Sequence, residues 1–404
     1  MEIMPILAAL RRNKIGALLI GLQIALTLAI VCNSLVIIHQ HARQMQRASG
    51  IDEADVFTLD NSWVGSPADL KALTEEDMAA IRATPGVVDA YATNSYPLAG
   101  GGWSTGLDMV ADQKTPTAQT SLYFVDEHAL QTLGLRLVAG RWFSAGEIGE
   151  MGLHDDKVPG SVVVTRSVAR VMFPAGNALG QQVYMDGKPT HIVGIVERAQ
   201  TPWAMSSWGE EFIENSTFIP LQLIDNGLSY VVRTRPGQRD SAMRLVQQRL
   251  YAVSRQRVVQ NVQSYTDTRA AAYAVPHATN VILLVVCGLL LAITVFGIVG
   301  LTMYWVAQRR RQIGMRRALG ARRIDILRYF HVENLMVSGV GAVLGIALGL
   351  GLNLWLATHL ELGRMSAGYI CVAALIVVAC SQAAVLWPAL RAASIPPATA
   401  TRMR

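Results

Sequence analysis

Two short runs of titratable residues are the first places in this sequence where chemistry could occur. Asp126–His128 reads Asp-Glu-His and His154–Asp156 reads His-Asp-Asp, so each combines carboxylate and imidazole groups of the kind that bind metals or move protons. Neither run has a second, spaced set of ligands, and side chains at adjacent positions seldom converge on one ion. We therefore expect no metal site and no catalytic residue here.

The sequence also gives no sign of a nucleotide-binding site. Its one Gly-Lys pair, Gly187-Lys188, is followed by proline and does not complete G-x-x-x-x-G-K-[ST], so we expect no ATP bound through a P-loop. The metalloprotease pattern H-E-x-x-H does not occur, and no serine is expected to act as a nucleophile. The chain is predicted not to be an enzyme and to carry no cofactor of its own.

Composition favours a membrane protein with a sizeable polar region. Hydrophobic residues make up 51% of the 404 residues and charged residues only 16%, too few to cover a soluble protein of this length. The hydrocarbon core of a bilayer takes about 20 apolar residues to cross. Four stretches meet this requirement and also contain all four cysteines, so no disulfide framework is expected in the polar region. These stretches are 15–38, 281–307, 332–358 and 367–390.

Charge is distributed unevenly along the chain. Residues 39–276 contain 20 Lys and Arg against 25 Asp and Glu, whereas the rest of the chain contains 15 against 4. A basic excess confined to the ends of apolar stretches is not the pattern of a nucleic-acid-binding protein. Under the positive-inside rule, the basic residues before 15–38, after 281–307 and after 367–390 face the cytoplasm. Both termini are therefore expected inside and residues 39–276 outside.

The external region, 39–276, is predicted to form a large α+β domain. Strand-like and helical runs alternate in two βαβ-like segments, at about 54–92 and 228–263. These segments flank a β-rich insertion at about 95–225. Since the first follows the first span and the second precedes the second span, we expect the membrane-proximal part to be built from both ends of the domain.

Shorter signals predict local features. Thr74 is expected to cap a helix in the first βαβ-like segment, and Asp186-Gly187 is expected to turn a hairpin in the insertion. Residues 1–14 combine apolar and basic residues, which favours a helix lying along the inner membrane surface. Residues 391–404 are expected to form a cytoplasmic tail.

Polar residues within the spans are mostly neutral, as is typical of hydrogen bonding between helices, so an ion-driven transporter is not favoured. Glu333 is the exception, and we expect it to pair with arginines of the preceding basic segment rather than to carry ions.

Gly341, Gly345 and Gly349 recur every four residues. This spacing favours the close approach of another helix, from this chain or from a second copy.

The segment between the second and third spans, 308–331, is the most unusual in the sequence. Residues 307–330 carry eight arginines and a single acid, Asp325. These charges would orient the neighbouring spans, but a topology signal does not require the glycines and alanines placed among them. The segment therefore indicates a second role.

The run RRRQIGMRRALGARRIDILRYFHVEN resembles the signature of FtsX/MacB-type ABC transporter permeases, in which a basic R-E-I-G-x-R-R-A-L-G-A segment leads through D-I-L into the third span. Similar runs in the first span, the external domain and the C-terminal WPALRAASIPPATATR extend the resemblance over nearly the whole chain. Gln312 stands where the family usually has Glu, and Arg322 where a helix-capping Ser or Thr is common. The chain resembles the split-subunit members, whose ATPase is a separate polypeptide.

In this family the basic segment is the coupling element that docks on the ATPase. An apolar edge flanked by arginines could enter a groove and pair with acidic groups, and small residues would allow the backbones to approach closely. The residues that the resemblance assigns to ATPase coupling are Ile313, Gly314, Arg316, Arg317, Ala318, Leu319, Gly320, Ala321 and Asp325.

The resemblance implies a mechanotransmission machine in the bacterial inner membrane. ATP and Mg²⁺ would bind a separate cytoplasmic ABC ATPase dimer, and the resulting movement would pass through the spans to the periplasmic domain. A second permease, identical or similar, would complete a dimer, and a periplasmic adaptor and an outer-membrane channel are further implied partners. The implied function is export of peptides, antibiotics or amphiphiles. The alternative is lipoprotein extraction or activation of a periplasmic enzyme by the same machine.

The sequence predicts that Arg317→Glu weakens docking of the ATPase while leaving membrane insertion intact. One of eight arginines is replaced, which is enough to disrupt a contact but not the charge bias that orients the spans. Co-purification of the ATPase with the variant measures the effect. Unchanged recovery of the ATPase would contradict this placement of the docking site.

Overall fold

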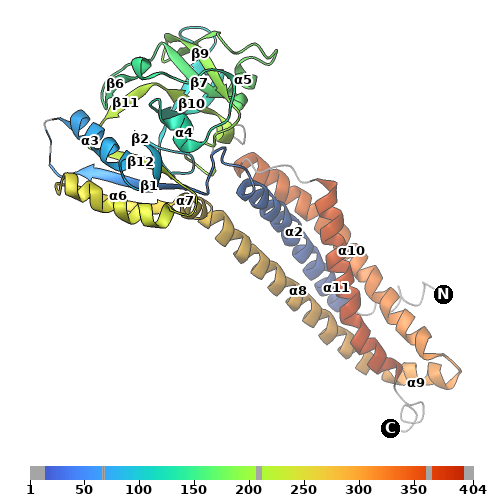
Figure 1. Cartoon of the computed structure of the whole chain (residues 1–404). Coiled ribbons are helices and arrows are strands. Elements are labelled where there is room, and N and C mark those ends of the chain that lie inside the picture. The colour runs from blue at the N-terminus through green and yellow to red at the C-terminus, as the bar shows by residue number, and fades with distance from the viewer. Residues whose placement is uncertain (1–13, 66, 68, 206–211, 361–365, 395–404) are drawn as a thin grey trace. The chain divides into compact units, whose positions relative to one another are not determined.

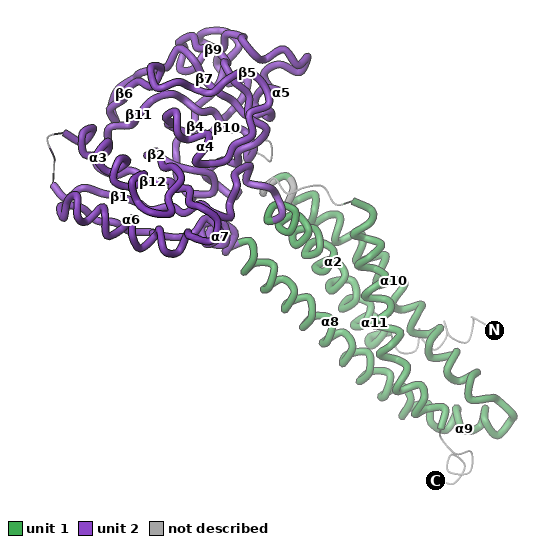
Figure 2. Tube along the Cα trace, in the orientation of Figure 1, with its two compact units in different colours: residues 1–45, 276–404 green, residues 46–275 purple. Residues whose placement is uncertain are grey.

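A computed structural model describes residues 14–65, 67, 69–205, 212–360 and 366–394 of the chain. The chain divides into two compact units, residues 1–45 with 276–404, and residues 46–275 (Figure 2). The expected N-terminal surface helix (1–14) lies almost entirely outside the described residues, as does most of the expected tail (391–404).

The first unit contains four helices long and apolar enough to cross a membrane, which confirms the predicted number of spans among the described residues. A fifth, short helix precedes the third of them (Figure 1). The helices are α2 (Lys14–Met45), α8 (Ala274–Gln308), α9 (Arg310–Ala318), α10 (Arg323–Leu360) and α11 (Ala367–Ala393).

The helices extend beyond the predicted apolar stretches. The segment expected to link the second and third spans, 308–331, consists of α9, a turn, and the first two turns of α10. No glycine or proline interrupts the sequence between Arg323 and Glu333, so α10 continues into the apolar stretch without a break. Buried side chains of α2, including Ile24 and Leu28, form the core of this unit with side chains of α8, α10 and α11.

The second unit contains an antiparallel four-stranded sheet in the order β13-β1-β12-β2. Helices α3 (Leu70–Arg82) and α6 (Arg239–Val253) pack against each other and share its hydrophobic core. This order interleaves the units β1-α3-β2 and β12-α6-β13, as in a split βαβ fold. Both ends of the domain therefore contribute to one sheet. Its strands are β1 (Val56–Trp63), β2 (Val87–Thr93), β12 (Gly227–Thr234) and β13 (Arg257–Ser264).

The insertion between β2 and β12 forms a seven-stranded sheet in the order β5-β9-β7-β10-β4-β3-β8. Because β8 also pairs with β9, six of these strands close into a ring. The strands are β3 (Trp103–Asp108), β4 (Ala118–Phe124), β5 (Leu137–Gly140), β7 (Ser161–Thr165), β8 (Gln182–Met185), β9 (Lys188–Val196) and β10 (Ser216–Ile219).

Smaller elements complete the second unit. Strands β6 and β11 pair in parallel and form a separate two-stranded sheet. These elements are β6 (Gly149–Gly152), β11 (Leu221–Ile224), α4 (Ala129–Leu133), α5 (Arg166–Met172), α7 (Tyr265–Ala272), η1 (Ala145–Glu147) and η2 (Phe212–Glu214).

The expected hairpin is confirmed, but the expected helix cap is wrong. Met185 pairs with Lys188 across the turn, where Asp186 and Gly187 both have positive φ angles, as a type I′ turn requires. Thr74, however, lies inside α3. The helix begins four residues earlier because the Asp69 carboxylate accepts a hydrogen bond from the backbone nitrogen of Ala72 at 2.9 Å.

A buried ion pair joins the two halves of the four-stranded sheet unit. Arg257 on β13 lies 2.6 Å from Asp77 on α3, and both side chains are fully buried. The Tyr230 hydroxyl donates to the same carboxylate oxygen at 2.7 Å, and the Arg257 guanidinium lies 4.0 Å from the centre of the Trp63 ring. The pair therefore links segments that are about 180 residues apart in the chain.

Removing one partner of this pair should destabilise the domain strongly, because a buried charge would be left without its counterion. We expect Asp77→Ala to lower the free energy of unfolding by about 3 kcal/mol. That loss lowers the thermal midpoint by roughly 6–12 °C for a unit of this size. Tryptophan fluorescence during heating measures it. Asp240→Ala is the control, because the Asp240 side chain is 75% exposed. Equal midpoints for the two variants would contradict the role of the pair.

Candidate functional site

The residues assigned to coupling lie on α9 (Figure 1) and on the turn that follows it, except Asp325, which lies in the first turn of α10. Ile313 and Gly314 are buried, and the other assigned residues are half-buried or exposed. Leu319 is 89% exposed, although leucine is usually buried. The segment thus has an anchored side and a side that presents an apolar residue among arginines.

A hydrogen-bonded turn fixes the position of this leucine. The backbone nitrogen of Ala321 donates to the carbonyl of Arg316 at 3.0 Å, and that of Gly320 donates to the carbonyl of Arg317 at 3.1 Å. These two bonds form a Schellman motif, which requires a left-handed residue after the helix. Gly320 supplies it with a φ of +100°. The glycine therefore holds Leu319 at the end of α9.

Asp325 lies in the first turn of the next helix, α10. Its carboxylate accepts a hydrogen bond from the backbone nitrogen of Arg322 at 2.9 Å. An acid in the first turn also interacts favourably with the helix dipole. This explains how α10 begins where the sequence has Arg322 instead of a capping Ser or Thr.

The buried side of α9 rests on the first turns of α10. Ile313 packs with Ile326 and Phe330 in the core of the unit. Beside them lies a cavity of about 80 Å³, which Arg316 and Tyr329 also line. The Arg316 guanidinium lies 5.3 Å from the centre of the Tyr329 ring, a favourable cation–π distance. Apolar and aromatic contacts therefore hold α9 against α10.

An ion pair adds a second attachment, as expected for Glu333. Nη1 of Arg309 lies 2.9 Å from each carboxylate oxygen of Glu333. The Glu333 side chain is only 2% exposed, and that of Arg309 is 13% exposed. Arg309 also donates to the Tyr329 hydroxyl at 3.3 Å. The sequence predicted an arginine partner but did not single out Arg309, which lies between the end of α8 and the start of α9.

The exposed face of the segment is broader than the sequence indicated. Met315 and Ile324 are each 48% exposed, and they add apolar surface to that of Leu319. Neither residue was assigned to coupling. Met315 lies on α9 and Ile324 on α10, so the exposure of each depends on the turn between the two helices, which the sequence does not define.

The three spaced glycines of α10 face α2 of the same chain. A Cβ added to Gly341 would lie 2.8 Å from the carbonyl oxygen of Gly21, and one added to Gly345 would lie 2.8 Å from that of Ala25. At Gly349 the nearest atom, in Ala29, is 3.4 Å away. The sequence left open whether the glycines pack on a helix of this chain or of a second copy. In the structure they pack on α2 of this chain.

The two titratable runs differ in their surroundings. In the first, Asp126 is close to Arg82 (3.4 Å), while His128 contacts Asp89 (3.0 Å). Burial raises the pKa of Asp126 to about 6, although the Arg82 charge opposes this. In the second run, Asp156 pairs with Lys188 at the surface. Among the described residues, no group of three metal-binding side chains converges on one point.

One serine stands in a Gly-x-Ser-x-Gly run, Gly102–Gly106, which was not singled out from the sequence. A nucleophile elbow requires the serine at a sharp turn between a strand and a helix. Ser104 lies instead within β3, paired with Ser121 of β4. The local geometry is therefore not that of a hydrolase.

Taken together, the helices and the domain between the first two of them define a multi-pass membrane protein of the permease type. Two family models match the chain. The model of the MacB-like periplasmic core domain covers residues 19–249, and that of the FtsX-like permease C-terminal region covers 284–397. The chain belongs to the MacB/FtsX family of ABC transporter permeases.

Curated relatives agree with this assignment. The chain is 24% identical over 372 residues to the macrolide export ATP-binding/permease protein MacB 1/2 of Paracoccus denitrificans, covering 86% of this chain and 50% of that protein. It is 30% identical over 223 residues to MacB of Hyphomonas neptunium, covering 49% of this chain and 31% of that protein. The chain spans about half the length, or less, of these relatives.

Two solved structures are also similar. The extracellular domain of the transporter YknZ from Gram-positive bacteria has a TM-score of 0.33 and 16% identity, covering 50% of this chain and all of that one. The periplasmic region of MacB from Actinobacillus actinomycetemcomitans has a TM-score of 0.32 and 15% identity, covering 57% of this chain and 97% of that one.

The packing of α10 on α2 predicts different effects of substitution at Gly341 and at Gly339. Gly341→Ala should destabilise the membrane unit by about 1–3 kcal/mol, because its methyl group would press on the α2 backbone. Gly339→Ala is the matched control, since a Cβ there meets no atom of the described residues within 4 Å. It should be neutral or slightly stabilising. Thermal unfolding in detergent distinguishes them, and equal midpoints would contradict the packing.

Proposed function

We propose that this chain is the permease subunit of a mechanotransmission ABC transporter. It couples ATP hydrolysis by a separate cytoplasmic ATPase to a conformational change of the periplasmic domain. The change drives export of peptides, antibiotics or amphiphiles. The main support is the exposed position of Leu319 on a basic segment that is firmly attached to a spanning helix.

The exposed face suits a protein partner. Leu319 and Met315 can enter an apolar groove, and the surrounding arginines can pair with acidic groups at its rim. Arginine pairs with carboxylates in two-point geometry and is frequent at such contacts. This combination supports docking to an ATPase more strongly than it supports a topology signal alone.

The attachments of α9 support a mechanical role. A force on α9 would pass to α10 through the Arg309–Glu333 pair and through the packing of Ile313. From α10 it would pass to α2 at Gly341 and Gly345, where the helices leave no space for slippage. Since α2 leads directly toward β1 in the chain, the movement can reach the periplasmic domain.

ATP and Mg²⁺ would bind the partner ATPase. In this chain Gly187-Lys188 belongs to the β8–β9 hairpin, which is not the strand-to-helix setting of a P-loop.

Two ATPase subunits would need two coupling segments, so a second permease, identical or similar, completes the assembly. The assembly would lie in the bacterial inner membrane, with cytoplasmic termini and a periplasmic domain. A periplasmic adaptor and an outer-membrane channel would complete the export route.

A pull-down of the chain from its native membrane in mild detergent, followed by mass spectrometry, tests this proposal. A P-loop ATPase recovered in near-equal amount supports it. A second permease among the recovered proteins distinguishes a heterodimer from a homodimer. Recovery of a periplasmic hydrolase or of lipoproteins instead of an adaptor would favour enzyme activation or lipoprotein extraction. Failure to recover any ATPase after nucleotide trapping would refute the coupling role.

The same pull-down can measure the effect of substituting Leu319. Leu319→Asp should lower ATPase recovery about tenfold, since it places a carboxylate where an apolar side chain would be buried. Leu153→Asp is the control, because Leu153 is also exposed (46%) but lies in the second unit. Equal ATPase recovery with both variants would show that Leu319 does not contact the ATPase.

A further inference from the structure

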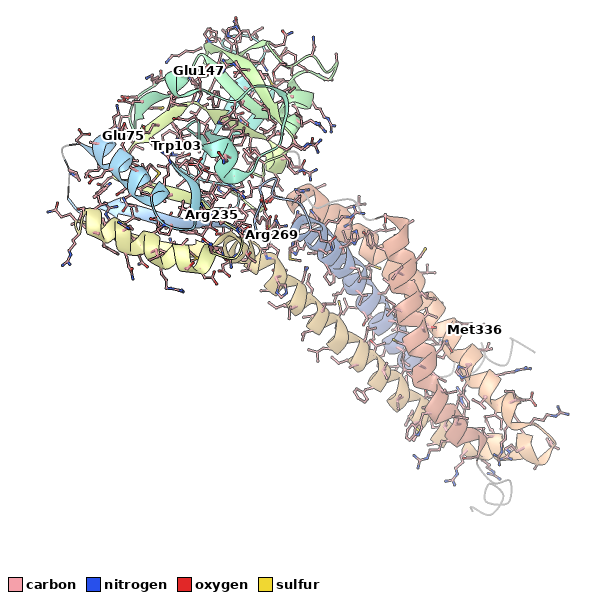
Figure 3. All side chains as sticks on the ribbon, in the orientation of Figure 1. Glu75, Trp103, Glu147, Arg235, Arg269 and Met336 are labelled. Atoms are coloured by element: carbon pink, nitrogen blue, oxygen red, sulfur yellow. The ribbon has the colours of Figure 1, made fainter. Side chains whose placement is uncertain are left out.

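The second unit contains a cavity of about 300 Å³ beside α3. One wall is a single face of α3, formed by Lys71, Glu75, Met78 and Arg82, which are spaced three or four residues apart. Figure 3 shows Glu75 on this helix. The volume is at the lower end of the range for small-molecule sites.

The opposite wall comes from the insertion. Asp126, Glu127 and His128 follow β4, while Glu150 and Gln222 come from the parallel pair β6 and β11. The cavity therefore lies where the α3 layer of the four-stranded sheet meets the seven-stranded part of the same unit. Ligand sites often lie at such junctions between two parts of a fold.

The basic side chains of the cavity already have close partners. Nζ of Lys71 lies 2.6 Å from a carboxylate oxygen of Glu150. Arg82 donates to the carbonyl oxygen of Ala90 from Nε at 3.0 Å and from Nη2 at 2.6 Å. Its Nε also lies 3.3 Å from Asp89. An incoming anion would have to displace these contacts.

The acidic side chains are less well compensated. Among the described residues, the nearest cation to Glu75 is Lys71 at 3.8 Å, while the basic group near Glu127 is the imidazole of His128 at 3.6 Å, which is a cation only when it is protonated. Asp126 is 3.4 Å from Arg82, a long distance for a charged pair. With His128 neutral, the lining residues carry four negative and two positive charges, a net charge of −2. The cavity therefore favours a cation.

Apolar surface accompanies this negative charge. Met78, Ala92, Val125 and Ile148 line the same cavity. Ala92 and Ile148 are half-buried, so they present apolar atoms to the cavity, whereas Met78 and Val125 are almost fully covered. A ligand that matches both features combines a charged amine with a small hydrophobic body.

From this combination we propose that the cavity binds an amphiphilic organic cation, with its ammonium group near the carboxylates that line the cavity and its apolar part against Ala92 and Ile148. A metal ion is a poorer match, because the acids are spread around the walls and do not converge among the described residues. Burial raises the pKa of Asp126 to about 6, so a bound ammonium group would favour the ionised carboxylate. The proposal does not depend on ATPase coupling.

Isothermal titration calorimetry of the full chain in lipid nanodiscs tests the site, with empty nanodiscs subtracted. The probe is 2-phenylethylamine, which is protonated at pH 7, and the matched neutral control is 2-phenylethanol. We expect saturable binding of the amine and at least tenfold weaker binding of the alcohol. Equal binding of the two compounds, or no saturable binding of the amine, would overturn the proposal.

Two variants on exposed positions locate the binding without disturbing the core. Glu75→Gln should weaken amine binding about threefold, because the Glu75 side chain is 59% exposed and its charge is partly screened. Ala145→Phe should abolish binding by filling the cavity mouth, since Ala145 lines the cavity from η1. Asp240→Asn, an exposed acid on α6, should leave binding unchanged. Unaltered binding in Ala145→Phe would exclude this cavity, and thermal midpoints establish that each variant is folded.

Discussion

The direct contact between the backbones of α10 and α2 is the constraint on which the membrane unit depends. At Gly341 and Gly345 no side chain of α10 separates the two helices, and backbone atoms of α2 lie in the space together with side-chain atoms of Ile24 and Leu28. A third contact is the Asn33 side chain, which donates to the carbonyls of Ala29 and Gly349 at 2.9 and 3.1 Å. In a membrane, close packing and such polar contacts replace the hydrophobic effect as the force that joins helices.

The basic segment 308–331 is attached to this framework through α10. Its helix, α9, is too short to be stable alone, since isolated helices need about 12–15 residues. It is held by Ile313, which packs on α10, and by the Arg309–Glu333 pair. A buried ion pair is costly to form and costly to break. The Arg309–Glu333 pair therefore favours one orientation of α9 over many. The position of Leu319 at the end of α9 depends on that orientation.

Local patterns in the sequence predicted some of these structural features but not others. Apolar length predicted the spans, and the Asp186-Gly187 pair predicted its hairpin, because both signals are contained in a few neighbouring residues. The partner of Glu333 depended on where α8 ends, which no strong helix breaker marks. The cavity beside α3 was not foreseen, since its walls come from segments that only the tertiary structure brings together.

The interleaved sheet has a consequence for the order of events during biosynthesis. Val56 of β1 pairs with Arg233 of β12, 177 residues further along the chain. At translation rates of about 5–20 residues per second, β1 waits roughly 9–35 s for this neighbour. Throughout that interval the emerging domain has unpaired strand edges, which are prone to aggregation. A segment of the insertion that pairs locally, such as the β8–β9 hairpin, shortens the length of chain that has unpaired strand edges during synthesis.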